Sequence, residues 1–210
     1  MMTIKRTVVL LLLAGLWGCT NNLTVVGDFP PPLIHTLPKS IGVLYDDDFR
    51  NYIYTEKSED RSKWIINNGN AQVTLFNRVL PVLFNHVEEV GQIPSLDAPA
   101  GTDLVLHPKV IEFQYSVPRE TRFKVYEVWI KYNLSLYDNQ GELIADWIVT
   151  AYGKTPTAFM QSNEEAMNAA VLVALRDLGA NLSLGTPRVP EIKAWLQNHS
   201  ASAQQASLEG

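Results

Sequence analysis

The chain has 210 residues, of which 46% are hydrophobic, 19% charged and 10% aromatic, and its formal net charge is −5. This composition excludes a collagen-like or wholly disordered chain, and the single cysteine excludes a scaffold of internal disulfides. An acidic chain without a basic cluster is poorly suited to nucleic acid, so we expect no nucleic-acid partner.

The N-terminus has the layout of a secretory signal. Residues 1–7 carry two positive charges and no acid, and residues 8–17 form an apolar run of ten. At about 1.5 Å per helical residue this run reaches roughly 15 Å, about half of the hydrocarbon core of a bilayer. It is too short for an ordinary membrane span, and no later stretch is long enough, so we predict no transmembrane helix.

The apolar run ends in Leu16-Trp17-Gly18-Cys19, and Cys19 is the sole cysteine. This segment resembles the bacterial lipoprotein signal, or lipobox. The resemblance implies that residues 1–18 are cleaved as a signal peptide and that Cys19 carries acyl chains such as palmitate, which anchor the protein in a membrane. Thr20 after the cysteine, in place of aspartate, implies the outer membrane. The alternatives are an ordinary signal peptide with a chance cysteine, or a buried structural cysteine.

Residues 19–38 contain four of the 12 prolines, including Pro30-Pro31-Pro32, and predict an extended tether between the lipid and the domain. The alternative, a strand packed on the domain, applies best to Leu23–Val26. A single periplasmic domain is expected over 39–197, followed by a disordered tail over 198–210.

The domain is expected to open with two strands and a helix. The strands are Ser40–Tyr45 and, after three aspartates, the alternating segment Phe49–Thr55. Residues 56–69 are polar and predict a loop. Apolar residues at three-and-four spacing then predict a helix over 71–90 with Asn70 as its N-cap and a kink or break near Leu80, caused by Pro81.

Three antiparallel strands are expected next, over 103–117, 122–138 and 142–153, with a hairpin turn at Asp138–Gly141. The second strand alternates most regularly, and the outer face of this sheet is expected to be wet or covered by something semi-polar. Ser162 and Glu165 then form a capping box that begins a helix over about 163–182, which Gly185 and Pro187 end. Residues 191–197 predict a further short helix. The predicted fold class is α+β: a two-layer sandwich in which two main helices cover one face of an antiparallel sheet.

No arrangement of residues points to catalysis. Asp46, Asp47 and Asp48 are the one candidate metal or acid/base cluster, but they lack the spacing of a calcium loop, so a charged turn is the preferred interpretation. The four histidines lack zinc spacing, and no nucleophile motif or phosphate-binding loop is present. We therefore expect no catalytic residue, no bound metal, no cofactor and no enzymatic activity.

The aromatic residues of the predicted strands are the remaining candidates for function. Trp129 and Tyr137 could form part of a partner surface if they are exposed together, and part of the core if they lie under a helix. The other strand aromatics are Tyr115, Tyr126, Tyr132, Trp147 and Tyr152.

The lipobox, the proline-rich segment, the long hairpin and the helix that begins S-N-E-E-A-M-N-A-A at Ser162 together resemble small Gram-negative periplasmic lipoproteins of the curli-secretion or penicillin-binding-protein-activator type. The resemblance implies a non-catalytic accessory subunit that binds a protein partner in envelope assembly or transport. Two alternatives remain open. One is a carrier for lipid or glycan that uses the aromatic sheet face or a groove beside Pro81. The other is a hydrolase built on Asp46–Asp48, which needs buried acids with shifted pKa values.

Overall fold

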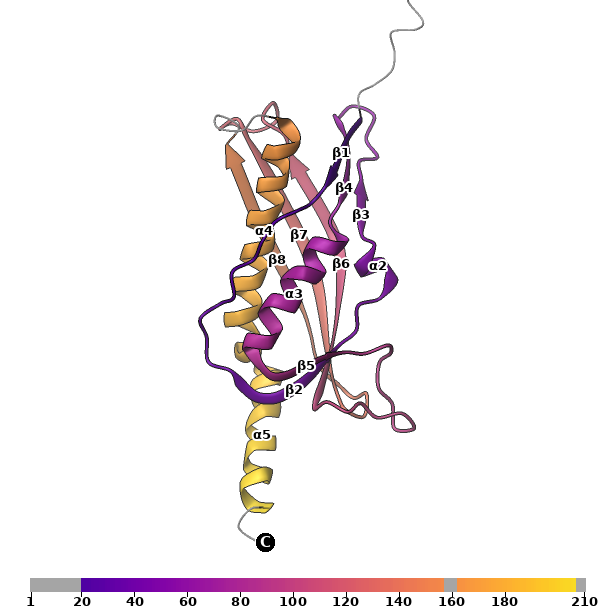
Figure 1. The fold of residues 1–210 in the computed structure, drawn as a ribbon, viewed down its shortest axis with the longest axis vertical. Helices are drawn as coiled ribbons and strands as arrows, with labels where there is room; N and C mark the ends of the chain where they lie inside the picture. Colours follow the sequence, from indigo (N-terminus) through magenta and orange to yellow (C-terminus); the bar gives the residue numbers. More distant parts are fainter. Residues whose placement is uncertain (1–19, 157–161, 207–210) are drawn as a thin grey trace, which may run out of the picture.

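A five-stranded sheet forms the long axis of the molecule (Figure 1). The computed structural model describes residues 20–156 and 162–206. The order of strands in the sheet is β5-β2-β6-β7-β8, and its last three strands are long and antiparallel. Their bounds are β2 Leu37–Val43, β5 Phe84–Glu89, β6 Leu104–Ser116, β7 Val125–Asp138 and β8 Leu143–Pro156.

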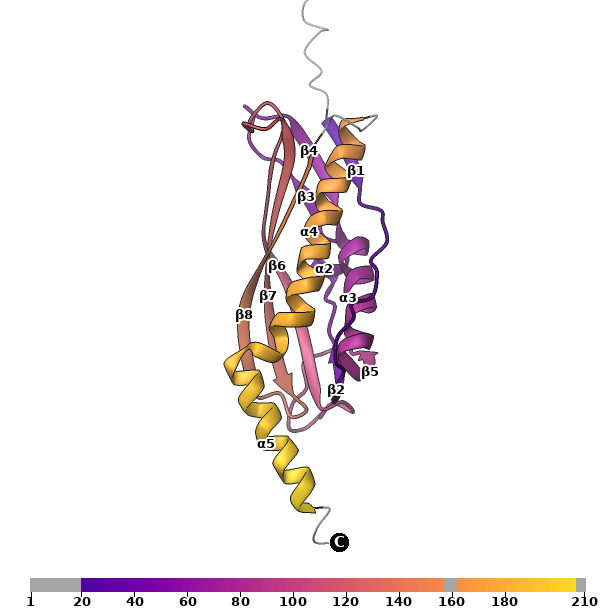
Figure 2. The ribbon, with the colours of Figure 1, turned by 90° about the vertical axis from the view of Figure 1, so that its left-hand side faces the viewer.

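A smaller sheet and the helices cover one face of this long sheet (Figure 2). The small sheet has the order β1-β4-β3, with β1 parallel to β4. Helix α4 lies along β8 and β7 and contacts α3, and α5 extends past the end of the sheet opposite to β1. The bounds are β1 Thr20–Thr24, β3 Ile53–Thr55, β4 Lys63–Asn67, α2 Asp47–Arg50, α3 Gly69–Leu83, α4 Asn163–Gly185, the 3-10 turn η2 Thr186–Arg188 and α5 Pro190–Ala206.

The core lies between the long sheet and this covering layer. Alternate residues of β7, from Val128 to Leu136, are buried, as their apolar-polar alternation predicts. The apolar stripe of α4 is buried against them, and the small residues Ala151 and Gly153 of β8 allow α4 to approach closely. The capping box is confirmed at its N-cap, where the Ser162 hydroxyl accepts a hydrogen bond from the backbone N–H of Glu165.

The α+β class is confirmed. The expectation of an antiparallel sheet is wrong for two of the four strand pairings in the long sheet. Strand β2 pairs in parallel with both β5 and β6. The physical reason is that the connection from β2 to β5 contains α3, which returns the chain to the end where β2 began, so that β5 runs in the same direction. The long sheet is therefore mixed.

The N-terminal half of the domain differs from the prediction in three places. The expected strand Phe49–Thr55 is instead the short helix α2 followed by β3, because the Asp46 carboxylate accepts the Phe49 N–H and caps a helical turn. Part of the expected loop 56–69 is strand β4. The expected helix 71–90 begins at Gly69, with Asn68 rather than Asn70 at its N-cap, and ends at Leu83, two residues after Pro81.

The expected tether is not a free segment where the structure describes it. Thr20–Thr24 form β1, and Phe29 is buried with 3% exposure. The backbone of Val26 exchanges two hydrogen bonds with the Asn168 side chain of α4, so residues 20–29 are attached to the domain. The alternative prediction, a strand over Leu23–Val26, agrees with the structure at Leu23 and Thr24, which belong to β1. Residues 198–206 of the expected disordered tail continue α5, and residues 207–210 lie outside the described residues.

Candidate functional site

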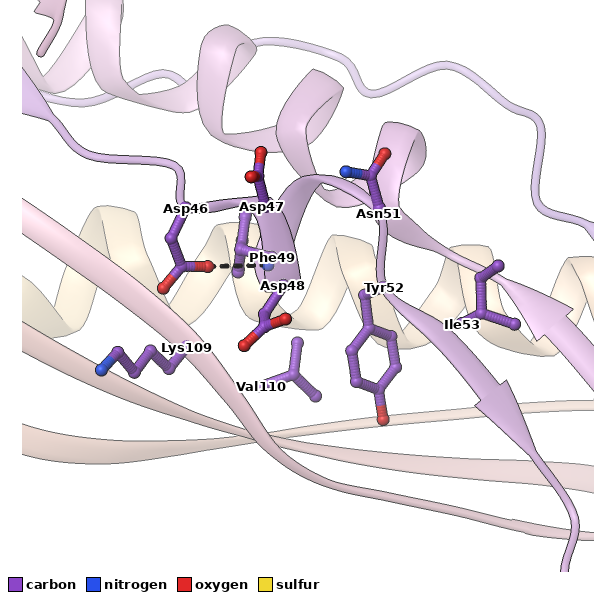
Figure 3. Close-up of a pocket in the computed structure, with 9 residues that line it drawn as sticks. All are labelled: Asp46, Asp47, Asp48, Phe49, Asn51, Tyr52, Ile53, Lys109 and Val110. Carbon is purple, nitrogen blue, oxygen red and sulfur yellow. Dashed lines mark hydrogen bonds between the residues drawn. The ribbon is translucent and has the colours of Figure 1, made fainter. Parts of the chain in front are cut away.

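An open pocket of about 540 Å³ lies where β2 ends and α2 begins, and it contains the three consecutive aspartates (Figure 3). Asp47, Asp48 and Tyr52 line one side, and Lys109 and Val110 of β6 line the other. The pocket exists because β2 pairs with β6 only as far as Leu106, after which the chain leaves the sheet to form α2.

Asp46 has a structural role at the edge of this pocket. One carboxylate oxygen accepts the Phe49 N–H at 2.8 Å, and the other lies 2.9 Å from Nε2 of the nearly buried His107. Burial acts to raise the pKa of Asp46, but the hydrogen bonds from His107 and from Phe49 outweigh it and hold the pKa below its ordinary value. Asp46 therefore stays ionised and holds α2 against β6.

Asp47 and Asp48 are exposed and occupy the first turn of α2, where negative charge is favourable. Within residues 20–156 and 162–206, no group of three or more histidine, cysteine, aspartate or glutamate side chains converges in a way that could hold a metal ion. The chemistry of the pocket is that of an acidic, open surface with one neighbouring lysine.

The outer face of the long sheet carries the aromatic candidates. Trp129 is half-buried, and its ring lies 5.2 Å from that of Tyr152 on the neighbouring strand. Beside it is an open pocket of about 310 Å³. Its lining is otherwise polar and comprises Glu112, Gln114, Ser116, Lys131 and Thr150. No helix of the described residues covers either ring, because α4 packs on the opposite face.

Tyr137, the other predicted partner residue, lies on the same face but not in the same place. It is eight residues along β7 from Trp129, which corresponds to roughly 27 Å in an extended strand. Between them, Asp146 accepts hydrogen bonds from Asn133 and Ser135, each at 2.8 Å. The structure therefore divides the predicted surface, and the aromatic pair is Trp129 with Tyr152. The pairing Trp129↔Tyr152 depends on the register shift between Leu136 and Tyr137, so the position of the hairpin turn alone does not predict this pair.

The histidines other than His107 lie in three different segments. His35 and His86 are exposed, and Nδ1 of His199 lies 2.8 Å from the Trp195 carbonyl. A groove beside Pro81, of about 280 Å³, is open and lined in part by Glu88 and Glu89. Cys19 and the rest of the lipobox lie outside the described residues. Among the described helices, none has both the length and the apolar character needed to cross a bilayer.

An ion cluster joins two turns at the end of the molecule where β1 begins. The Arg61 guanidinium donates to Glu56 at 2.9 Å and to Glu120 at 2.8 Å, and its plane lies over the Tyr115 ring. The hydrogen bond from Arg61 holds the pKa of Glu120 below its ordinary value, against the smaller effect of burial. For Glu56, burial acts to raise the pKa, but the Ser58 N–H and the neighbouring donors, Arg61 among them, outweigh it and lower it.

Comparison with known proteins gives a likeness in fold. No family model matches the sequence, and no curated protein matches it. Among solved structures, a Xanthomonas campestris protein described as DUF330 is 12% identical, with a TM-score of 0.50 over 88% of this chain and 96% of that one. A minor lipoprotein from Acinetobacter baumannii is 13% identical with a TM-score of 0.39, over 70% of this chain and 90% of that one. Lipoprotein GNA1162 from Neisseria meningitidis is 11% identical with a TM-score of 0.29, over 78% and 99%.

At these identities the likeness concerns the fold alone. The chain shares the overall fold of the Xanthomonas protein across nearly the whole length of both. The resemblance to curli-secretion and penicillin-binding-protein-activator lipoproteins stays a prediction.

Proposed function

We propose that this chain is a lipoprotein of the Gram-negative outer membrane, anchored through acyl chains on Cys19. Its domain acts in the periplasm as a non-catalytic binding subunit in envelope assembly or transport. The observation that carries the proposal is the position of the sole cysteine, directly after a short apolar run that follows a positive N-terminus.

The geometry of the domain supports an anchor at this residue. Strand β1 begins at Thr20, immediately after Cys19, at one end of the long axis (Figure 1). Because one extended residue spans at most about 3.6 Å, acyl chains on Cys19 hold this end at the bilayer surface. The molecule then projects its long axis away from the membrane, with α5 at the far end.

The polar groups of the pocket that contains Asp46, Asp47 and Asp48 support a binding role rather than a catalytic one. Asp46 is engaged in capping α2 and in its contact with His107, and Asp47 and Asp48 are exposed to solvent. A hydrolase needs acids whose pKa values are matched to proton transfer near neutral pH, whereas the pKa of Asp46 is lowered. The half-exposed Trp129 with Tyr152 is the more suitable feature for a partner contact.

The anchor is tested by Cys19→Ser, because serine cannot form the thioether. We expect the wild-type protein to fractionate with the outer membrane and the variant to leave it. A variant that stays in the outer-membrane fraction and resists extraction with salt contradicts the anchor.

The binding role is tested by placing a photo-crosslinking amino acid at position 129 in the native envelope, with position 137 as the matched control on the same strand. We expect one recurrent protein adduct from position 129 and none from position 137. If neither position yields a specific adduct, the partner surface is wrongly assigned.

A second candidate, glycan binding, is favoured by the same aromatic pair. The pocket beside Trp129 combines a ring face with Glu112, Gln114 and Lys131, and sugars are bound by such a mixture of ring faces and polar groups. Soluble peptidoglycan fragments should then change the fluorescence of the wild type but not that of Trp129→Ala. An unchanged wild-type signal at saturating concentration removes this candidate.

A further inference from the structure

The turn between β6 and β7, residues 117–124, lies at the end of the molecule where β1 begins (Figure 1). The contacts establish this placement step by step. Thr20 pairs with Lys63 in the small sheet. Two residues before Lys63, Arg61 forms its ion pair with Glu120 of the turn. The turn is therefore fixed beside the point where Cys19 joins the domain.

Hydrogen bonds within the turn hold its shape. The Glu120 carboxylate accepts the Val117 N–H at 3.1 Å. The Thr121 hydroxyl donates to the Val125 carbonyl and accepts the Val125 N–H, each at 3.0 Å. This closure places Lys124 in the left-handed region, with φ of 56°, which a lysine adopts only when its surroundings impose it. The turn is thus a built structure rather than a loose connection.

Phe123 projects from this closed turn into solvent, with 79% of its surface exposed. It is flanked by Arg122 and Lys124, and Arg119 is also exposed. The turn has three basic residues and one acid, whereas the whole chain has a formal charge of −5. An exposed aromatic ring among cations is the composition of segments that insert a ring into the headgroup region of anionic lipid.

We propose that the turn 117–124 is a second membrane contact, in which Phe123 enters the lipid interface and the flanking cations meet anionic headgroups. The inference rests on the proposed anchor at Cys19, which leaves no free tether between the lipid and β1. Because no free segment separates the anchor from β1, the domain keeps this turn at the bilayer surface. A protein partner would have to bind Phe123 in the same narrow space, so the lipid is the occupant that the geometry favours.

The turn can be tested with one thiol label, because Cys19 is the only native cysteine. The lipidated full-length mature protein carrying Phe123→Cys is labelled with a nitroxide and reconstituted into vesicles of phosphatidylethanolamine and phosphatidylglycerol. Paramagnetic resonance then compares the access of oxygen, which concentrates in lipid, with that of a water-soluble nickel complex. Leu96→Cys is the matched control. Leu96 is 80% exposed and precedes β6, at the opposite end of a strand of 13 residues.

We expect the label at position 123 to favour oxygen and the label at 96 to favour the nickel complex. The preference at 123 should weaken when phosphatidylglycerol is replaced by phosphatidylcholine. Equal access of the nickel complex to both positions overturns the inference. The anchor is tested separately. The wild-type protein should take up no label, because the sulfur of its only cysteine is in a thioether. Labelling of the wild type contradicts the anchor itself.

Discussion

Gly153 shows how closely helix α4 and strand β8 approach each other. A Cβ atom at this position would overlap the backbone carbonyl oxygen of Ala170 and the amide nitrogen of Ala174. Since backbone atoms of a packed helix cannot move aside as a flexible side chain can, the close approach requires glycine here. The neighbouring inward-facing residue of β8, Ala151, is also small, whereas Trp147 and Val149 further along the strand are larger.

Replacing Gly153 by alanine should therefore force α4 away from the sheet. We expect Gly153→Ala to lower the free energy of unfolding by about 2 kcal/mol or more, measured by urea denaturation. Gly91→Ala is the matched control, because an added Cβ meets nothing within 4 Å there, and it should leave stability unchanged or slightly raised. Equal effects of the two substitutions would show that the close packing at Gly153 is wrongly described.

The aromatic pair Trp129–Tyr152 shows what could be predicted of the site at the scale of residues. Alternation along β7 places Trp129 on the outer face, as the sequence predicts. The distance between Trp129 and Tyr137 also follows from their spacing in one strand. The exposed fraction of each ring could not be predicted, because it depends on the neighbouring strands and on the turn beyond them.

Helix α4 is the element that sequence reasoning predicted best, and its buried face can be tested directly. Val171 is fully buried, whereas Val173, two residues on, is 38% exposed. We expect Val171→Asp to lower the free energy of unfolding by about 3 kcal/mol or more, because a charge enters the core without a partner. Val173→Asp should cost far less, as judged by thermal melting. Similar melting temperatures for the two variants would mean that the wrong face of α4 has been placed in the core.

The contribution of the Arg61 ion cluster to the stability of the protein should depend on pH. The pKa values of Glu56 and Glu120 are lowered in the folded protein, so the unfolded chain takes up protons first as the pH falls. Their contribution to stability is therefore present above the ordinary carboxyl pKa of about 4.3 and is lost as the pH falls through the lower folded values.

Glu120→Gln should accordingly destabilise the protein at neutral pH, by about 1 kcal/mol because water partly screens this pair. The difference from wild type should shrink toward zero in acid, as followed by denaturation at a series of pH values. Glu59→Gln, an exposed change in the neighbouring turn, is the control and should have little effect at any pH. A deficit for Glu120→Gln that stays constant down to strongly acidic pH would contradict the assignment of the ion cluster.

Elements in the N-terminal half were harder to predict because their local patterns are ambiguous. The apolar residues of β5 continue the three-and-four spacing of α3, so only the end of the helix after Pro81 separates the two. Strand β4 follows a polar segment, and its signal is limited to the alternately buried Trp64 and Ile66. The parallel pairing of β2 depends on contacts with strands that are distant in the sequence, so the local pattern of residues does not predict it.

At the scale of the whole molecule, the long axis has β1 at one end and α5 at the other (Figure 2). Proline content alone suggested a free tether, but the pairing of β1 with β4 and the contacts of Val26 with α4 bind that segment to the domain. If Cys19 carries the proposed acyl chains, the domain is therefore held close to the bilayer, with no free segment between the anchor and β1.

Intact mass spectrometry of the protein purified from native membranes tests this account most directly. We expect a chain that begins at Cys19 and is heavier than the bare polypeptide by a diacylglycerol group and one amide-linked fatty acid. A mature chain with an unmodified first residue, or one that still carries residues 1–18, would contradict the anchor and with it the orientation of the domain at the membrane.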